Sequence, residues 1–214
     1  MASLLTHAAV GIALGQAATP KLRQRPIFWA VTVLCSILPD FDVIGFPFGV
    51  RYGDLWGHRG MTHSLLFAAV AAGVFALALE DKAHERWKLG GLLFLITASH
   101  GVLDALTNGG LGVAFFSPFD QRRYFFPWRP ILVSPMGARA LFSWRALQVM
   151  QHELWVWGPA LALSVAMWAI RNRSRNGNLA QPVTAFPSIE STSSISSNMP
   201  GKAKPTKTMP NRLN

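Results

Sequence analysis

Four histidines and three aspartates stand at the ends of apolar segments in this sequence, where membrane proteins seldom carry ionisable groups because burying them is costly. His100 and Asp104 are four residues apart, so a helix places both on one face, within reach of one cation. Imidazole and carboxylate ligands together suit zinc, with manganese or iron as alternatives. The predicted metal ligands are His7, Asp40, Asp42, His58, His63, His100 and Asp104.

Seven ligands are too many for one tetrahedral metal site. Either two or three ions share them, or one ion is bound and the remaining carboxylates orient the histidines. Two ions bridged by a carboxylate lower the pKa of a water and stabilise both the attacking and the leaving oxygen of a phosphoester. The ligand set therefore predicts hydrolysis by a metal-activated water, which needs no serine or cysteine nucleophile.

Several of these residues also have a simpler interpretation. Asp42 lies in a Pro-Asp-Phe-Asp string that is typical of a turn ending a helix, and His7 could be a hydrogen-bonded contact between helices. One residue of Thr62–Ser64 is expected to cap the following helix, which is compatible with metal binding by its neighbours. His84 lies in a charged turn and is expected to be solvated, and His152 makes a poor pair with the adjacent glutamate.

The elements that must position these residues are apolar helices. Half of the 214 residues are hydrophobic, 14% are charged and the mean hydropathy is +0.27, whereas a soluble domain carries about 25% charged residues. A soluble enzyme is therefore excluded in favour of an all-α, polytopic membrane bundle of four to five short spans. The apolar stretches are Leu4 to Ala18, Ile27 to Leu38, Ser64 to Leu79, Leu89 to Leu106 and Leu154 to Ile170.

The positive charge divides the chain into two parts. Of the net charge of +10, +6 lies between Arg171 and Asn214, in a segment rich in serine and proline that is too polar to build a core. We therefore expect a membrane-embedded domain over residues 1–170 and a disordered basic tail over 171–214. With Phe186 as its single aromatic residue, the tail is expected to bind anionic lipid headgroups and no specific nucleic acid.

The distribution of lysine and arginine also predicts sidedness. If all five stretches cross the membrane, 13 basic residues lie on one side and 7 on the other. The positive-inside rule then places the tail in the cytoplasm. The segments from Pro39 to His63 and from Thr107 to Glu153 share the opposite face, whichever way the protein inserts, and the predicted ligands gather there.

At these residues the sequence resembles the YdjM-like family of LexA-regulated, inner-membrane-bound metal-dependent hydrolases. The resemblance covers roughly residues 4 to 135 and rests most specifically on the His-Arg-Gly-x-Thr-His-Ser string that begins at His58. The other shared motifs are His7, Leu38 to Asp42, Ser99-His100 with Asp104, and Arg129 to Val133. The family is distantly similar to zinc-dependent phospholipases C and S1/P1-type nucleases, which implies phosphoester hydrolysis with zinc at the bacterial inner membrane.

Two arginines are candidates for substrate contacts. Arg59, between two predicted ligands, could neutralise a phosphate in the transition state, or could only pair with Asp54 or Asp42. Arg129 ends an aromatic and basic segment suited to the headgroup level, where it could guide a lipid to the site or only anchor the loop.

The sequence thus predicts a multi-pass hydrolase of the inner membrane, with its site at the outer (periplasmic) face. A metal-bound water would cleave a phospholipid or a lipid-linked phosphate, with Arg59 and Asp42 as catalytic residues and Arg129 in substrate binding. The alternative is a non-enzymatic membrane protein whose metal ion is structural or transported. A structural site would be closed, while a catalytic site keeps a coordination position open to water.

Overall fold

The computed structural model describes residues 1–134 and 143–179, and all regular structure there is helical. The described residues contain no β-strand and only two isolated β-bridges, Thr107–Ile131 and Val113–Tyr124. The predicted all-α class is therefore confirmed for this part of the chain. The helices are α1 (Leu4–Gly15), α2 (Pro20–Arg23), α3 (Pro26–Ile37), the 3-10 helices η1 (Leu38–Phe48) and η2 (Met61–His63), α4 (Leu65–Leu79), α5 (Ala83–Ala105), α7 (Trp144–His152) and α8 (Leu154–Leu179).

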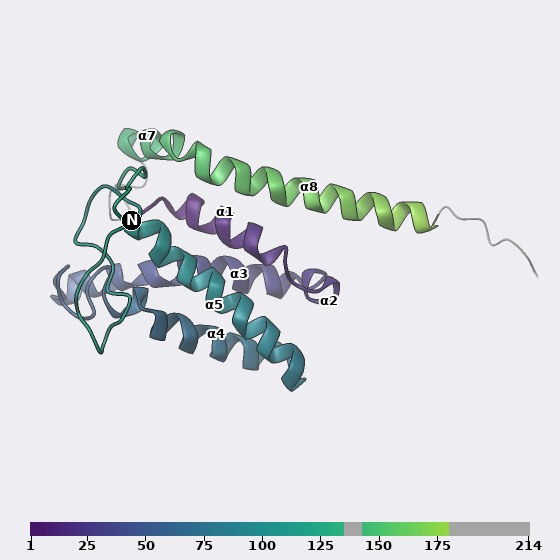
Figure 1. The fold of residues 1–214 in the computed structure, drawn as a ribbon, viewed down its shortest axis with the longest axis horizontal. Helices are drawn as coiled ribbons and strands as arrows, with labels where there is room; N and C mark the ends of the chain where they lie inside the picture. Colours follow the sequence, from purple (N-terminus) through teal and green to yellow (C-terminus); the bar gives the residue numbers. More distant parts are fainter. Residues whose placement is uncertain (135–142, 180–214) are drawn as a thin grey trace, which may run out of the picture.

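Helix α5 is the centre of the bundle and packs against α1, α3 and α4, whereas α8 packs mainly against α1 (Figure 1). The core contains Phe28, Cys35, Leu93 and Ile96, all fully buried between these helices. Gly11 allows α1 and α3 to approach closely, since a Cβ added there would lie 2.6 Å from the Cβ of Ser36. Small residues therefore bring the helices together, as expected where lipid provides little hydrophobic drive.

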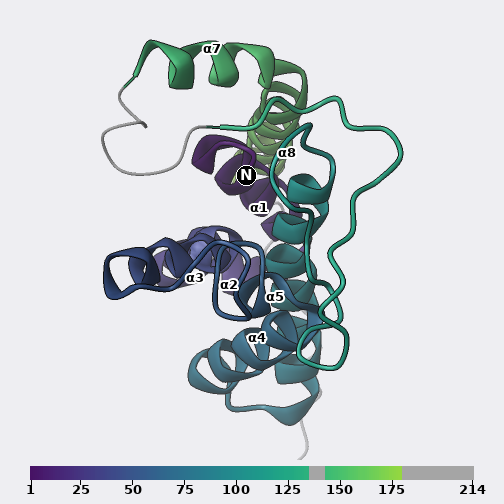
Figure 2. The same cartoon turned by 90° about the vertical axis from the view of Figure 1, so that its left-hand side faces the viewer.

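One end of the bundle collects the helix termini that bear the predicted ligands. Helices α1 and α4 begin there, each capped by a serine side chain, Ser3 and Ser64, and α3 and α5 end there. Figure 2 views this end, with the connecting segments in front and α7 running across the direction of α8. The predicted grouping of the segments from Pro39 to His63 and from Thr107 onward at one end of the bundle is thus confirmed.

Two stretches are long and apolar enough to cross a membrane in the described part of the chain: Pro26–Phe48, which joins α3 to η1, and Leu154–Ser174 in α8. Helices α1 and α4 are apolar but shorter. The prediction of four to five spans is therefore not confirmed, because two of the apolar stretches form helices below the length of a full span. Helix α8 is the most exposed of these elements, with only 6% of its apolar window buried.

Helix α8 extends past the boundary predicted at residue 170 and continues through Leu179. The first part of the segment predicted to be disordered is therefore helical. Residues 180–214 lie outside the described residues, so their predicted disorder and their binding to anionic headgroups stay predictions.

Candidate metal centre

All seven predicted ligands converge at the end of the bundle where the helix termini meet, and all seven are buried. His7 comes from the first turn of α1, and His100 and Asp104 come from the last two turns of α5. Asp40 and Asp42 lie in η1, directly after the end of α3. His58 lies in the segment between η1 and η2, and His63 is the last residue of η2. The structure therefore joins ligands that are separated by up to 97 residues in the sequence.

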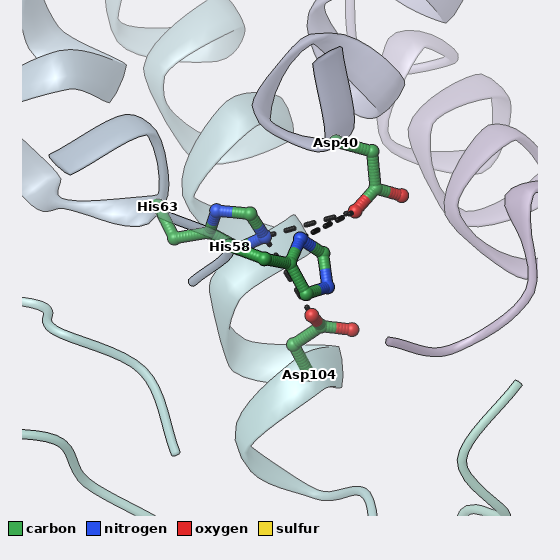
Figure 3. A group of neighbouring side chains, drawn as sticks. All are labelled: Asp40, His58, His63 and Asp104. Carbon is green, nitrogen blue, oxygen red and sulfur yellow. Dashed lines mark ion pairs between the residues drawn. The ribbon is translucent and has the colours of Figure 1, made fainter. Parts of the chain in front are cut away.

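Four of these side chains, Asp40, His58, His63 and Asp104, point toward one another (Figure 3). One ligand atom from each lies within 4.8 Å of the others. The Nε2 atom of His63 is 3.7 Å from Asp40 Oδ1 and 3.6 Å from Asp104 Oδ2. Two imidazoles and two carboxylates at this spacing form a complete donor set for one zinc ion.

A second group of three, His7, His100 and Asp104, meets the same criterion. The two imidazole rings are stacked, with centroids 3.7 Å apart and planes 12° apart. His7 Nε2 lies 3.4 Å from Asp104 Oδ1, while the partner oxygen Oδ2 faces the first group. Asp104 therefore belongs to both groups, and its carboxylate would be shared if each group held an ion.

Most of the buried polar atoms without a hydrogen-bond partner in the described residues belong to this cluster. They are both nitrogens of His7, both carboxylate oxygens of Asp40, and the Nε2 atoms of His58, His63 and His100. Asp104 Oδ2 also has no hydrogen-bond partner, although it forms an ion pair with Arg59. Leaving one such group unpaired costs about 1–3 kcal/mol, so native proteins rarely do it. Unpaired donors of the metal-ligating types in one place fit a site for cations.

Hydrogen bonds on the opposite side of the rings orient the histidines. His100 Nδ1 donates to the carbonyl of Ser36 at 2.8 Å, so its Nε2 atom is the acceptor. Asp42 lies 2.9 Å from His58 Nδ1 and 3.3 Å from His63 Nδ1, and it also accepts a hydrogen bond from Thr62 Oγ1 at 2.8 Å. Ligating histidines typically have such partners, which places Asp42 behind the ligands.

The pKa values of two histidines outside the membrane-spanning helices are shifted in opposite directions. Burial opposes the charged form of His63, but hydrogen bonds to Asp104, Asp40 and Asp42 outweigh it and raise its pKa to about 10. Burial lowers the pKa of His58 and outweighs its hydrogen bond to Asp42. Without metal, His63 thus holds a proton that a cation would have to displace.

Arg59 is fully buried beside the cluster and pairs with Asp104, whereas the sequence suggested Asp54 or Asp42. Its Nε atom lies 3.0 Å from Asp104 Oδ2, and its two terminal nitrogens donate to the Gly109 carbonyl and the Thr107 hydroxyl, each at 2.8 Å. The backbone of Arg59 has a φ of 65°, which is uncommon for a non-glycine residue. The guanidinium thus neutralises and positions Asp104.

The loop from residue 122 to 129 reaches the cluster through a different arginine from the one predicted. Arg123 donates to the carbonyl of His58 at 2.9 Å and to that of Asp54 at 3.1 Å, so it holds the segment that bears His58. Arg129 is exposed and lies over the ring of Phe125, 4.8 Å from its centroid. The structure therefore does not bring Arg129 to the cluster.

Sequence reasoning missed Glu153, which connects α8 to α1. Its buried carboxylate accepts hydrogen bonds from the Ser3 amide at 3.1 Å and from the Thr6 hydroxyl at 2.6 Å. The adjacent Ala2 amide donates to Asp104 Oδ1 at 2.7 Å, so the anchored start of α1 also holds Asp104. The neighbouring His152 is exposed and outside the cluster, as is His84 at the opposite end of the bundle. The exposure of His84 confirms the expectation that it is solvated.

Comparison with known proteins follows the same part of the chain. The model of a family described as YdjM inner membrane protein matches residues 1–176, which extends beyond the predicted range of 4 to 135 and includes most of α8. The inner membrane protein YbcI of Escherichia coli (strain K12) is 38% identical over 175 residues, covering 78% of this chain and 98% of that protein. The uncharacterized protein YvsG of Bacillus subtilis (strain 168) is 30% identical over 125 residues, covering 55% of this chain and 75% of that protein. No solved structure matches the chain.

Proposed function

The chain belongs to the YdjM inner membrane protein family, and from this and the buried cluster we propose that it is a membrane-bound, metal-dependent phosphoester hydrolase. Zinc is the proposed metal, because the donors are imidazoles and carboxylates, with manganese or iron as alternatives. The proposed substrate is a phospholipid or a lipid-linked phosphate.

The observation that carries the proposal is the convergence of unpartnered Nε2 atoms and carboxylate oxygens on two groups that share Asp104. Bound there, two ions would lower the pKa of a water and stabilise the charges on the attacking and leaving oxygens. The chain's own contribution is orientation. Asp42 and the Ser36 carbonyl hold the imidazole rings, and Arg59 offsets the charge of Asp104. In this proposal Asp42 and Arg59 position the ligands and need not contact the substrate.

Exposed aromatic side chains at the same end of the bundle support a lipid substrate. Phe119 is 86% exposed, and large exposed rings surround the cluster in the connecting segments and in α7. Aromatic side chains of membrane proteins gather at the level of the headgroups. The further members of this exposed set are Phe48, Trp56, Trp128 and Trp144. We therefore propose that the cluster lies at the membrane–water interface, and on the periplasmic side if all five apolar stretches cross the membrane.

The burial of the cluster favours a second candidate, a structural metal site in a non-enzymatic protein. Every predicted ligand is buried, and a closed site leaves no coordination position for water. Substitution by cobalt distinguishes the two. The absorption spectrum of a catalytic site changes when phosphate is added, whereas that of a closed site does not.

The first test is the metal content of detergent-purified protein, measured by elemental mass spectrometry. The wild type should contain one to two equivalents of zinc, and both His100→Ala and Asp104→Ala should lose most of it. His84→Ala and His152→Ala are matched controls, because these histidines are exposed and outside the cluster. Absence of bound metal after reconstitution with zinc, manganese or iron would overturn the proposal. If metal is bound, phospholipids and phosphodiesters are the substrates to assay.

A further inference from the structure

A cleft of about 940 Å³ opens between α8 and the first three helices, at the end of the bundle opposite the metal centre. Its volume lies in the range of small-molecule binding sites. The walls are largely apolar and include Val33 of α3, Leu161 of α8 and the rings of Trp29 and Trp168. The cleft exists because α8 packs on α1 and leaves the neighbouring face of α3 uncovered (Figure 1).

Two arginines meet at one end of this cleft. Arg23 donates to the carbonyls of Gln16 and Ala18, at 2.8 and 2.6 Å. Arg171 donates to the side-chain oxygen of Gln16 at 2.5 Å and to its carbonyl at 3.1 Å. All these acceptors are neutral, and within residues 1–134 and 143–179 neither guanidinium forms an ion pair with a carboxylate. Two positive charges thus share one glutamine without a counter-charge.

The two guanidinium groups also affect each other electrostatically. Burial, and then the charge of Arg171, lower the pKa of Arg23, although an arginine remains protonated in a protein. An anion stabilises neighbouring positive charges, and guanidinium groups bind phosphate in bidentate geometry. The mouth of the cleft is therefore suited to a phosphate group.

The apolar walls determine which phosphate compound fits. A soluble phosphate ester would leave the apolar side chains of the cleft in contact with water, whereas hydrocarbon chains would cover them. The family is one of inner membrane proteins, so lipids surround the chain. From the combination of arginine pair and apolar cleft, we propose that an anionic phospholipid binds here, with its phosphate between Arg23 and Arg171 and its chains against Val33, Leu161 and Val165.

This site is separate from the metal centre and does not depend on the proposed hydrolase function. The residues that line it belong to α1, α2, α3 and α8, and none is a predicted metal ligand. The bound lipid would hold α8 against α3, a contact that the protein itself does not make closely. Loss of the lipid would leave the metal content unchanged.

Native mass spectrometry of the detergent-purified full chain tests the proposal. The protein is mixed with equal amounts of phosphatidylglycerol and phosphatidylcholine that have the same acyl chains. The wild type should retain phosphatidylglycerol preferentially, and Arg23→Gln and Arg171→Gln should each lower this preference about fivefold. Arg171→Lys should keep most of the preference, because it keeps the charge. Equal retention of the two lipids by the wild type would overturn the proposal.

Three controls separate this site from general attraction to basic surface. Arg86→Gln removes an arginine at the same end of the bundle that donates to the Glu80 and Asp81 carbonyls, and it should leave the preference unchanged. Val165→Trp should block the cleft, whereas Val70→Trp on α4 should not, although the two valines are similarly exposed, at 63% and 57%. Glycerophosphate should not displace the lipid. Three outcomes would refute the assignment. Arg86→Gln could lower the lipid preference as much as Arg23→Gln does, glycerophosphate could displace the lipid, or a second protein chain could occupy the cleft in place of the lipid.

Discussion

The charged side chains at the two ends of the bundle have different kinds of partner. At the metal centre, Asp40 Oδ1 lies 3.3 Å from His100 Nε2 and 3.7 Å from His63 Nε2, and Asp104 Oδ2 lies 3.0 Å from Arg59 Nε. At the arginine cleft, Arg23 and Arg171 meet only neutral oxygens. The first region gathers nitrogen and oxygen atoms of the types that bind cations, and the second gathers two guanidinium groups of the type that binds anions. What each end binds is thus indicated by the polar groups that its own side chains bring together.

The strongest test of this contrast is Asp104→Asn, which removes the carboxylate shared by both ligand groups and leaves Arg59 buried without its partner. We expect loss of bound metal and a fall of about 3–5 kcal/mol in the free energy of unfolding. Elemental analysis and thermal unfolding in detergent measure the two effects. Asp120→Asn is the matched control, since Asp120 pairs with the exposed Arg122 at the same end and should leave the free energy of unfolding nearly unchanged. Full metal content in Asp104→Asn would contradict a bridging role.

A smaller effect is expected for Asp42→Asn, which preserves the size of the side chain but weakens its hold on His58 and His63. Because Asp42 orients ligands, zinc affinity should fall about 10–100-fold while saturating zinc still fills the site. Competition with a chelator of known affinity measures this change. An affinity equal to that of the wild type would show that the ring orientations do not depend on Asp42.

The pH dependence should distinguish the two ends further. The pKa of His63 is raised to about 10 in the metal-free protein, so its protonated form stabilises the fold below pH 6.5, and this stabilisation is lost as the pH rises toward 10. Zinc binding must displace that proton, so zinc affinity should rise with pH by up to about tenfold per unit over this range. Calorimetry in two buffers of different ionisation enthalpy detects the released proton. By contrast, lipid retention by Arg23 and Arg171 should not change between pH 6.5 and 9. If zinc affinity does not depend on pH, His63 is neutral before zinc binds.

The smallest effect is expected from truncation after Leu179, where α8 ends. The removed segment, residues 180–214, contributes none of the ligands or cleft residues named here, so metal content and membrane insertion should not change. Elemental analysis and membrane fractionation check both. A loss of metal would assign the removed segment a part in the fold.

Sequence reasoning identified the side chains that converge on the cluster because their signals are local. His100 and Asp104 share a helix face by their spacing, and Ser64 caps α4 as the sequence near Thr62 suggested. It misassigned the partner of Arg59, because the guanidinium bridges to Asp104 and Thr107, some 45 residues away. The role of Glu153 was missed for the same reason, since its partners lie at the opposite end of the chain. The predicted count of spans is not confirmed, because apolar composition does not set helix length, and α1 and α4 are shorter than a full span.

The sequence by itself determined the helical class, the apolar character and which polar side chains gather at one end of the bundle, since each of these follows from residue types and from spacings within a helical turn or two. Tertiary structure alone decided that Asp104 serves both ligand groups, that Asp42 stands behind the histidines, and that an apolar cleft with two unpaired arginines separates α8 from α3. The physical reason is that hydrogen bonding, charge pairing and packing act over a few ångströms in space. Those distances are set by how the helices pack, which the local pattern of residues does not specify.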